Sequence, residues 1–124
     1  LYVANFEGNT LSVLETSNGD ILDIIPAGEN THAVDVSPDG KHVWVVASGS
    51  GEVTVFDAEN SYEVVKVLTF ERPNHVAFLP EGNEVYITDT PSRELIALDA
   101  KTFAELGKAP LGEAPHEIDF VANN

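Results

Sequence analysis

The sequence predicts an all-β fold made of three copies of one structural unit. Its 124 residues align with themselves at an offset of 42 without a gap, so that Tyr2, Trp44 and Tyr86 fall in one column. Short runs of strand-forming residues alternate with turn signals, and no segment has the apolar spacing of a helix. A fixed period of this length indicates supersecondary units that cannot bury their apolar faces alone, so the fold is an array.

The middle unit shows the strands of one copy most clearly. We expect four strands there, at residues 33–37, 41–47, 52–57 and 62–68. In the first turn, Pro38 presets φ and Gly40 accepts a positive φ. Residues 48–51, rich in Gly and Ser, form the second turn, and residues 58–61 form the third.

The first and last units repeat this order of strands and turns. Residues 80–82 (Pro-Glu-Gly) fall in the column of the first turn, and Asn18-Gly19 is a hairpin signal between the third and fourth strands. Residues 43–47 and 22–25 are largely apolar at successive positions. Such runs indicate strands that are covered on both faces, as in small sheets stacked face to face.

Four antiparallel strands in about 42 residues are typical of a β-propeller blade. The alternative is a β-sandwich of about a dozen short strands, but a sandwich has no reason to repeat in sequence. We therefore predict one β-propeller segment over residues 1–124. Its three blade-equivalents are the repeats 1–42, 43–84 and 85–124.

Three blades are too few to close a ring, because known propellers have about four to eight. The chain has no methionine and opens in the second strand of a blade, which suggests a segment of a longer protein. Residues 118–121 are expected to form the first strand of the next blade. The segment is therefore expected to be part of a larger or oligomeric ring, and two partners can supply the rest of it. These are further blades of a parent chain, or a second copy that gives six blades.

Three stretches of the chain resemble the YVTN-type β-propeller repeat family. They are residues 2–5 (YVAN), 9–16 (NTLSVLET) and 37–41 (SPDGK), and the similarity runs over essentially the whole chain. The resemblance implies a propeller and, because the family includes surface-layer proteins, a periplasmic or cell-surface location. Related propellers include haem-d1 domains, amine dehydrogenase subunits and lactonases. The resemblance therefore implies an architecture without implying one activity.

Composition excludes several classes of function. The chain has no cysteine, so it has neither disulfides nor thiolate metal ligands. Its net charge of −15 argues against binding to nucleic acid or anionic lipid, both of which need a basic surface. No apolar stretch approaches the roughly 20 residues of a spanning helix, so we expect no membrane insertion.

The loops that enter the innermost strands carry the main candidate site. Two columns of this loop hold Glu29, Glu71 and Glu113, and three residues further on His32, Asn74 and His116. In a propeller these loops surround the mouth of the central channel, where such side chains can bind a divalent cation or act as general bases. The alternative is a solvated Glu beside a His or Asn that hydrogen-bonds the loop. His75 lies one residue off the column, and its side chain is free to point elsewhere.

Acidic residues inside the strands have a separate interpretation. Asp35 and Asp119 lie in innermost strands, so each is expected on the wall of a hydrated channel or paired with a hydrogen-bond donor. Three acids close the third strand of every unit and are expected to accept backbone N–H bonds across the next turn. These three are Glu15, Asp57 and Asp99.

The sequence contains no nucleophile elbow, phosphate-binding glycine loop or haem-attachment motif, and we assign no catalytic residue. We expect a non-catalytic propeller scaffold for binding or surface display, with no cofactor in this segment. The first alternative is part of a redox or metal- or haem-binding propeller enzyme that uses the Glu and His of the channel mouth. A lactonase-like hydrolase is the last alternative.

Overall fold

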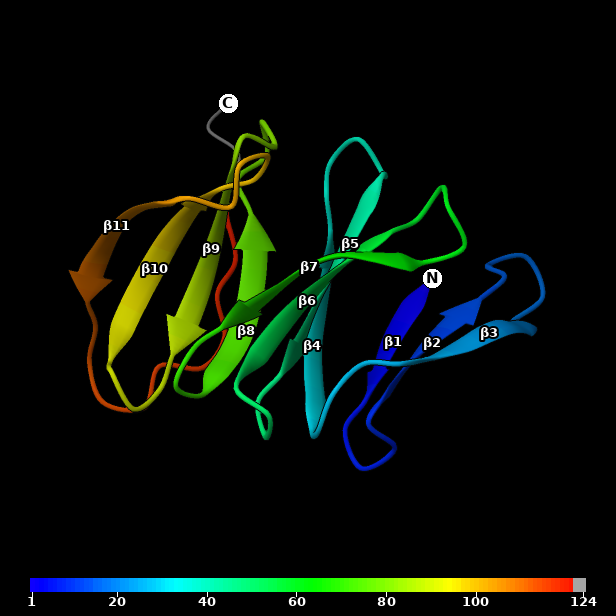
Figure 1. Ribbon diagram of the computed structural model, residues 1–124, viewed down its shortest axis with the longest axis horizontal. Coiled ribbons are helices and arrows are strands. Elements are labelled where there is room, and N and C mark those ends of the chain that lie inside the picture. The colour runs from blue at the N-terminus through cyan, green and yellow to red at the C-terminus, as the bar shows by residue number, and fades with distance from the viewer. Residues whose placement is uncertain (122–124) are drawn as a thin grey trace.

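The computed structural model describes residues 1–121 and shows three antiparallel sheets arranged side by side (Figure 1). The first sheet contains β1 (Tyr2–Asn5), β2 (Thr10–Leu14) and β3 (Ile21–Pro26). The second contains β4 (Thr31–Val36), β5 (His42–Ala47), β6 (Glu52–Asp57) and β7 (Glu63–Thr69). The third contains β8 (Pro73–Phe78), β9 (Glu84–Asp89), β10 (Glu94–Asp99) and β11 (Glu105–Pro110).

Each sheet is an antiparallel meander, in which consecutive strands are neighbours. The first sheet has three strands because the chain enters it at the second strand of the repeat, as the sequence predicts. Strand β4 contacts both β1 and β8, so the sheets meet along their inner strands. This arrangement confirms the prediction of an all-β array of propeller-type blades.

The backbone conformation of equivalent turns repeats from blade to blade, even where the residue type changes. Gly40 and Gly82 have φ values of 75° and 77° in the first turn of their blades. In the turn between the third and fourth strands, Gly19, Ser61 and Phe103 all adopt a positive φ. Ser and Phe there occupy a left-handed conformation that costs a residue with a Cβ atom about 1–2 kcal/mol. The position within the repeat therefore determines the conformation of this turn more than the type of residue found there does.

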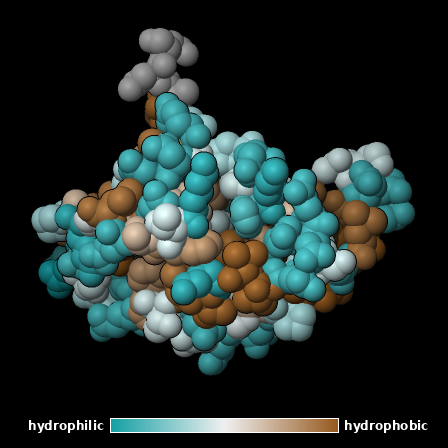
Figure 2. Space-filling view, turned by 45° about the horizontal axis from the view of Figure 1, so that its top comes forward, coloured by the Kyte–Doolittle hydropathy of each residue, from teal (hydrophilic) through white to brown (hydrophobic). Residues whose placement is uncertain are grey.

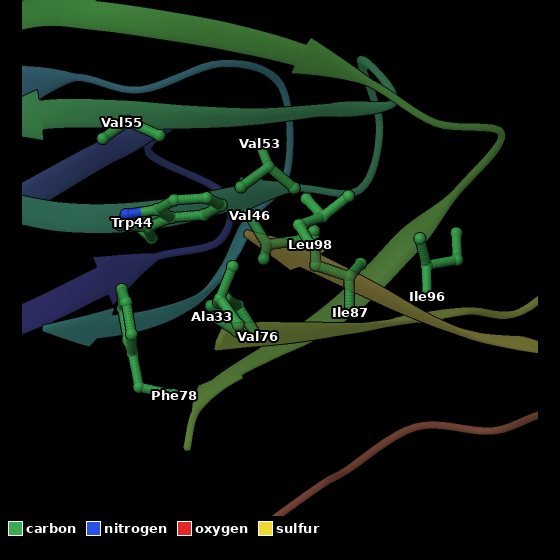
Figure 3. Packing of buried hydrophobic residues seen from close by; sticks show 11 residues of the cluster. Ala33, Trp44, Val46, Val53, Val55, Val76, Phe78, Ile87, Ile96 and Leu98 are labelled. Atoms are coloured by element: carbon green, nitrogen blue, oxygen red, sulfur yellow. The ribbon is translucent and has the colours of Figure 1, made fainter. Parts of the chain in front are cut away.

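The core joins neighbouring blades through the aromatic column predicted from the repeat. Trp44 packs edge-on against Phe78 of the next blade, with ring centroids 5.7 Å apart, and Tyr86 packs against Phe120 at 5.1 Å. Around Trp44, apolar side chains of the second and third sheets point toward one another (Figure 3). The fully buried members of this cluster include Val46, Val53, Val55, Val85 and Ile87. Of this column, Trp44 is a fully buried core residue, whereas Tyr2 and Tyr86 are half-buried.

The prediction that residues 22–25 are covered on both faces is wrong. Residues 43–47 are buried as expected, but strand β3 is exposed along most of its length, with Leu22 62% exposed and Ile24 54% exposed. The reason is topological: the fourth strand of each blade lies at the outer edge of its sheet, where no neighbouring blade covers it. Strand β7 is exposed in the same way at Val64 and Val67. Apolar patches are visible between hydrophilic areas of the surface (Figure 2).

The structure also differs from the prediction in the C-terminal segment. Residues 118–121 were expected to form a strand, but they form no ladder with any other described segment. A first strand pairs with the second strand of its own blade, and no such strand follows it within residues 1–121. Phe120 nevertheless packs on Tyr86, as the equivalent residue Phe78 packs on Trp44. The last three residues of the predicted repeat 85–124 lie outside the described residues. Within residues 1–121, no helix is long and apolar enough to cross a membrane.

Candidate functional site

Three histidine rings from successive blades meet beside the inner strands. His32 lies on β4, His75 lies on β8, and His116 follows β11. The ring centroids of His32 and His116 are 4.9 Å apart. The ring of His75 lies 6.1 Å from that of His32 and 5.9 Å from that of His116. The structure thus brings together the two histidines of the predicted column and adds His75, which the sequence left free to point elsewhere.

Strands β4 and β8 begin with the same register shift, which leaves both His32 and Asn74 without a partner in the ladder. The pairing of β8 with β9 shifts between Pro73 and His75, so that Asn74 has no partner in the ladder. Asn74 is buried, and its side-chain amide donates to Thr90 Oγ1 and to the carbonyl of Pro115. Asn74 therefore holds the loop before His116, and His75 occupies the place in the cluster that the column assigned to Asn74.

Hydrogen bonding fixes the tautomer of His32. Its Nδ1 lies 3.0 Å from the carbonyl oxygen of Asn74, and a carbonyl only accepts, so Nδ1 carries the proton. In the neutral ring, the free lone pair is then on Nε2. The ring also packs edge-on against Phe6, with centroids 5.8 Å apart. His32 is thus oriented by contacts with the first and third blades.

Burial lowers the pKa of His75 below the ordinary value of histidine. Desolvation is the largest cause, because the protein interior disfavours the imidazolium. Charge on His32 and His116 lowers it further, and the carboxylates of Glu117 and Asp35 act in the opposite direction. His75 therefore stays neutral, with a free lone pair, over a wider pH range than a solvated histidine.

Glu117 completes the cluster and was not predicted. One atom each of His75, His116 and Glu117 lies within 4.8 Å of the other two. Within residues 1–121 this is the one such group of three histidine or acidic side chains. The repeat contained a signal for it, because Ala33, His75 and Glu117 share the column directly after that of His32.

The predicted glutamate column does not join this group. Glu29, Glu71 and Glu113 are exposed, and their backbones serve the loops instead. The carbonyl of Glu29 accepts from Gly49 N, and Glu71 N donates to the buried carboxylate of Asp89 at 2.9 Å. Glu113 lies 3.7 Å from Arg93 in a solvated ion pair, a type that contributes little to stability.

Next to the rings is a hollow of about 400 Å³. It is lined by side chains that include Phe6, His32, Arg72, Asn74, Thr90 and His116. Although the chain has 21 acidic residues, no carboxylate of residues 1–121 is among its lining. Arg72 is the one lysine or arginine side chain among those lining residues. The lining itself thus carries one cationic side chain and no carboxylate, while Glu117 lies beside the lining residue His116.

Asp35 and Asp119 differ in structure although they share a column. Asp35 is half-buried, and its Oδ2 accepts from the backbone N–H of Phe78 in the next blade at 2.9 Å. Its Oδ1 accepts from Val36 N at 2.8 Å. Asp119 is exposed, and among residues 1–121 its carboxylate accepts from Phe120 N alone, at 2.8 Å. Asp35 is therefore paired with a hydrogen-bond donor, which is one of the two expected roles, and its bond links two blades.

The acids that close the third strands bind their turns as predicted. Asp57 Oδ1 accepts from Glu59 N at 2.9 Å, and Asp99 Oδ1 accepts from Thr102 N at 2.7 Å. Glu15 Oε1 accepts from Ser17 N at 3.2 Å. These backbone bonds stabilise the carboxylates and lower the pKa of Glu15 and Asp99. The three residues are structural and lie outside the histidine cluster.

The sequence matches one known protein family over most of its length. Residues 1–117 match the family described as "Lactonase, 7-bladed beta-propeller". The chain belongs to this lactonase family. Its three blade-equivalents are fewer than the seven of the family's ring, which agrees with the prediction of a part of a larger propeller. No protein of curated function matches the sequence.

Solved structures similar to this lactonase-family chain have diverse functions. Hydrazine synthase of Kuenenia stuttgartiensis is 16% identical with a TM-score of 0.78, over 86% of this chain and 31% of that one. The dihydro-haem d1 dehydrogenase NirN is 22% identical with a TM-score of 0.75, over 91% and 24%. A proposed 6-phosphogluconolactonase from Bacteroides uniformis is 19% identical with a TM-score of 0.70, over 88% and 39%.

These similarities establish the fold alone. The chain spans between about a quarter and two fifths of the length of these neighbours. The predicted link to haem-d1-type propellers is confirmed at the level of architecture, and the family established here is the lactonase family.

Proposed function

We propose that this chain is a non-catalytic scaffold whose blades present the hollow at the histidine cluster to a small anionic ligand. The observation that carries the proposal is the lining of the hollow, which includes Arg72 and two histidines and no carboxylate of residues 1–121. On a chain with a net charge of −15, an anion approaching elsewhere meets repulsion. Loops on a rigid β scaffold are common positions for binding residues.

A sugar acid phosphate is the most direct probe of this site. One structural neighbour is a proposed 6-phosphogluconolactonase, which motivates 6-phosphogluconate as a non-reactive ligand. We expect 6-phosphogluconate to bind and Arg72→Ala to weaken binding about tenfold or more, since a hydrogen bond to a charged group contributes about 1.5–3 kcal/mol. The measurement is isothermal titration calorimetry on the full chain.

Arg93→Ala is the matched control, because Arg93 is also exposed and is not among the residues that line the hollow. Equal losses of affinity in the two variants would count against the hollow and would indicate attraction to surface charge only. No binding of 6-phosphogluconate would remove this ligand class from the proposal.

A lactonase-like hydrolase is the second candidate, and the family match favours it. The imidazole of His116, which lines the hollow, is a suitable general base for water that attacks a lactone carbonyl. Hydrolysis of 6-phosphogluconolactone above the spontaneous rate, abolished by His116→Ala, would support this candidate over a binding scaffold. Binding of 6-phosphogluconate without turnover would support the scaffold.

The resemblance to YVTN-type repeats supports a scaffold that acts outside the cytoplasm, at the periplasm or the cell surface. Secretion of the full-length parent protein by its own organism, followed by cell fractionation, is the test. Recovery in the cytoplasmic fraction alone would contradict this location.

Further blades complete the ring in our proposal, and either a longer parent chain or a second copy supplies them. Two features support this: β1 is an edge strand of its sheet, and the family's propeller has seven blades. Val3 of β1 and Phe6 just after it are also exposed. We expect light scattering of the chain to give a mass above 13.3 kDa, as a dimer or a mixture of larger particles. A monodisperse monomer would contradict both routes.

A further inference from the structure

We infer that His75, His116 and Glu117 form a binding site for one divalent transition-metal ion of the zinc type. One ligand atom from each side chain lies within 4.8 Å of the other two. This site goes beyond the proposed ligand-binding function, since it stands whether or not the hollow binds an organic anion.

The donor set suits zinc. Two imidazole nitrogens and one carboxylate oxygen are ligands that Zn²⁺ accepts, at about 2.0–2.2 Å each, with a fourth position left open. Two ligand atoms of a tetrahedral ion are about 3.3–3.5 Å apart, so each pair of side chains needs to close by at most about 1.5 Å. His116 and Glu117 are exposed and can make this adjustment by rotating their side chains.

The backbone around both histidines is held by one hydroxyl. Thr88 is 2% exposed, and its Oγ1 accepts from the backbone N–H of His75 at 3.2 Å. The same oxygen donates to the carbonyl of His116 at 2.8 Å. A neighbouring hydroxyl, that of Thr90, donates to the carbonyl of Pro115 at 2.9 Å. The backbones of two histidines 41 positions apart in the sequence are therefore held relative to one another before any ion binds.

His32 flanks the site as a positioning residue. Its ring packs edge-on against both ligand histidines. Its Nδ1–H is tied to the carbonyl of Asn74, so the ring cannot turn freely. Without the His32 ring, both ligand rings lose a packing contact that limits their rotation, so we expect weaker metal binding.

The test is metal binding by the full chain after treatment with a chelator. We expect calorimetry at neutral pH to give one Zn²⁺ per chain. We expect Co²⁺ to give the intense visible absorption of a tetrahedral site, and Zn²⁺ to displace it. His75→Ala, His116→Ala and Glu117→Gln should each lower the Zn²⁺ affinity by more than about tenfold. His42→Ala removes the one other histidine, which lies outside the cluster, and should leave the affinity unchanged.

Two measurements separate loss of the site from loss of the fold. Glu117 is exposed, so Glu117→Gln should leave the far-UV circular dichroism spectrum unchanged while affinity falls. His32→Ala should weaken binding without changing the stoichiometry. Zn²⁺ affinity that is equal in all three ligand variants and the wild type, or no binding at millimolar Zn²⁺, would overturn the inference. Zn²⁺ binding by a chain that does not bind 6-phosphogluconate would support the metal site while removing the proposed ligand.

Discussion

Replacing Trp44 with alanine is expected to lower the free energy of unfolding by about 3–5 kcal/mol, the usual cost of removing a large aromatic side chain from a core. Trp44 is 1% exposed and contacts the next blade at Phe78 and Phe103, with both pairs of ring centroids 5.7 Å apart. The cavity left by the indole would lie between two blades. Small domains are stable by only about 5–15 kcal/mol, so this loss would be a large share of the total.

Urea denaturation followed by circular dichroism measures the effect, and Leu106→Ala is the control. Leu106 lies on the outer strand β11 and is 54% exposed, so its truncation should change stability by less than about 0.5 kcal/mol. Trp44→Phe keeps an aromatic ring in the site and should fall between the two. Similar losses for Trp44→Ala and Leu106→Ala would mean that the blades do not pack through this column.

Asp35→Ala is expected to lower the free energy of unfolding by about 1.5–3 kcal/mol, the range for a hydrogen bond to a charged group. The carboxylate of Asp35 bridges two blades, from β4 to the N–H of Phe78, and the variant leaves that donor without its partner. Asp35→Asn retains an acceptor oxygen and should lose less. Thermal or urea unfolding of the three proteins gives the comparison.

The chain offers a close control for this bond. Asp23 and Asp119 each accept from the N–H of the following residue at 2.8 Å, as Asp35 does, but neither makes the inter-blade bond. Asp23→Ala and Asp119→Ala should therefore change stability by less than about 0.5 kcal/mol. A loss for Asp35→Ala no larger than theirs would show that the bond between blades contributes nothing measurable.

The repeat predicted the fold because each column meets the same surroundings in every blade. The contact of Trp44 with Phe78 recurs as the contact of Tyr86 with Phe120, since both pairs are separated by the same number of residues. Exposure could not be predicted in this way. Strand β3 has the apolar residues of a covered strand, but its position at the outer edge of the sheet is set by topology.

The candidate site was predicted in part. His32 and His116 share a column and do meet, as column reasoning requires. The columns did not predict His75, because nothing in the sequence indicates that the Asn74 side chain bonds to Thr90 and to the carbonyl of Pro115. Glu117 was not predicted, because the repeated glutamates lie in another column, whose members Glu71 and Glu113 are exposed.

The proposed metal site is tested most directly by the position of a bound ion relative to His75 and His116. Crystals of the chain grown with Zn²⁺, with diffraction data collected on both sides of the zinc absorption edge, give an anomalous difference map. The account predicts one peak at about 2.0–2.2 Å from a nitrogen of His75, a nitrogen of His116 and an oxygen of Glu117. A map with no peak there, or with its main peak at His42, would contradict it.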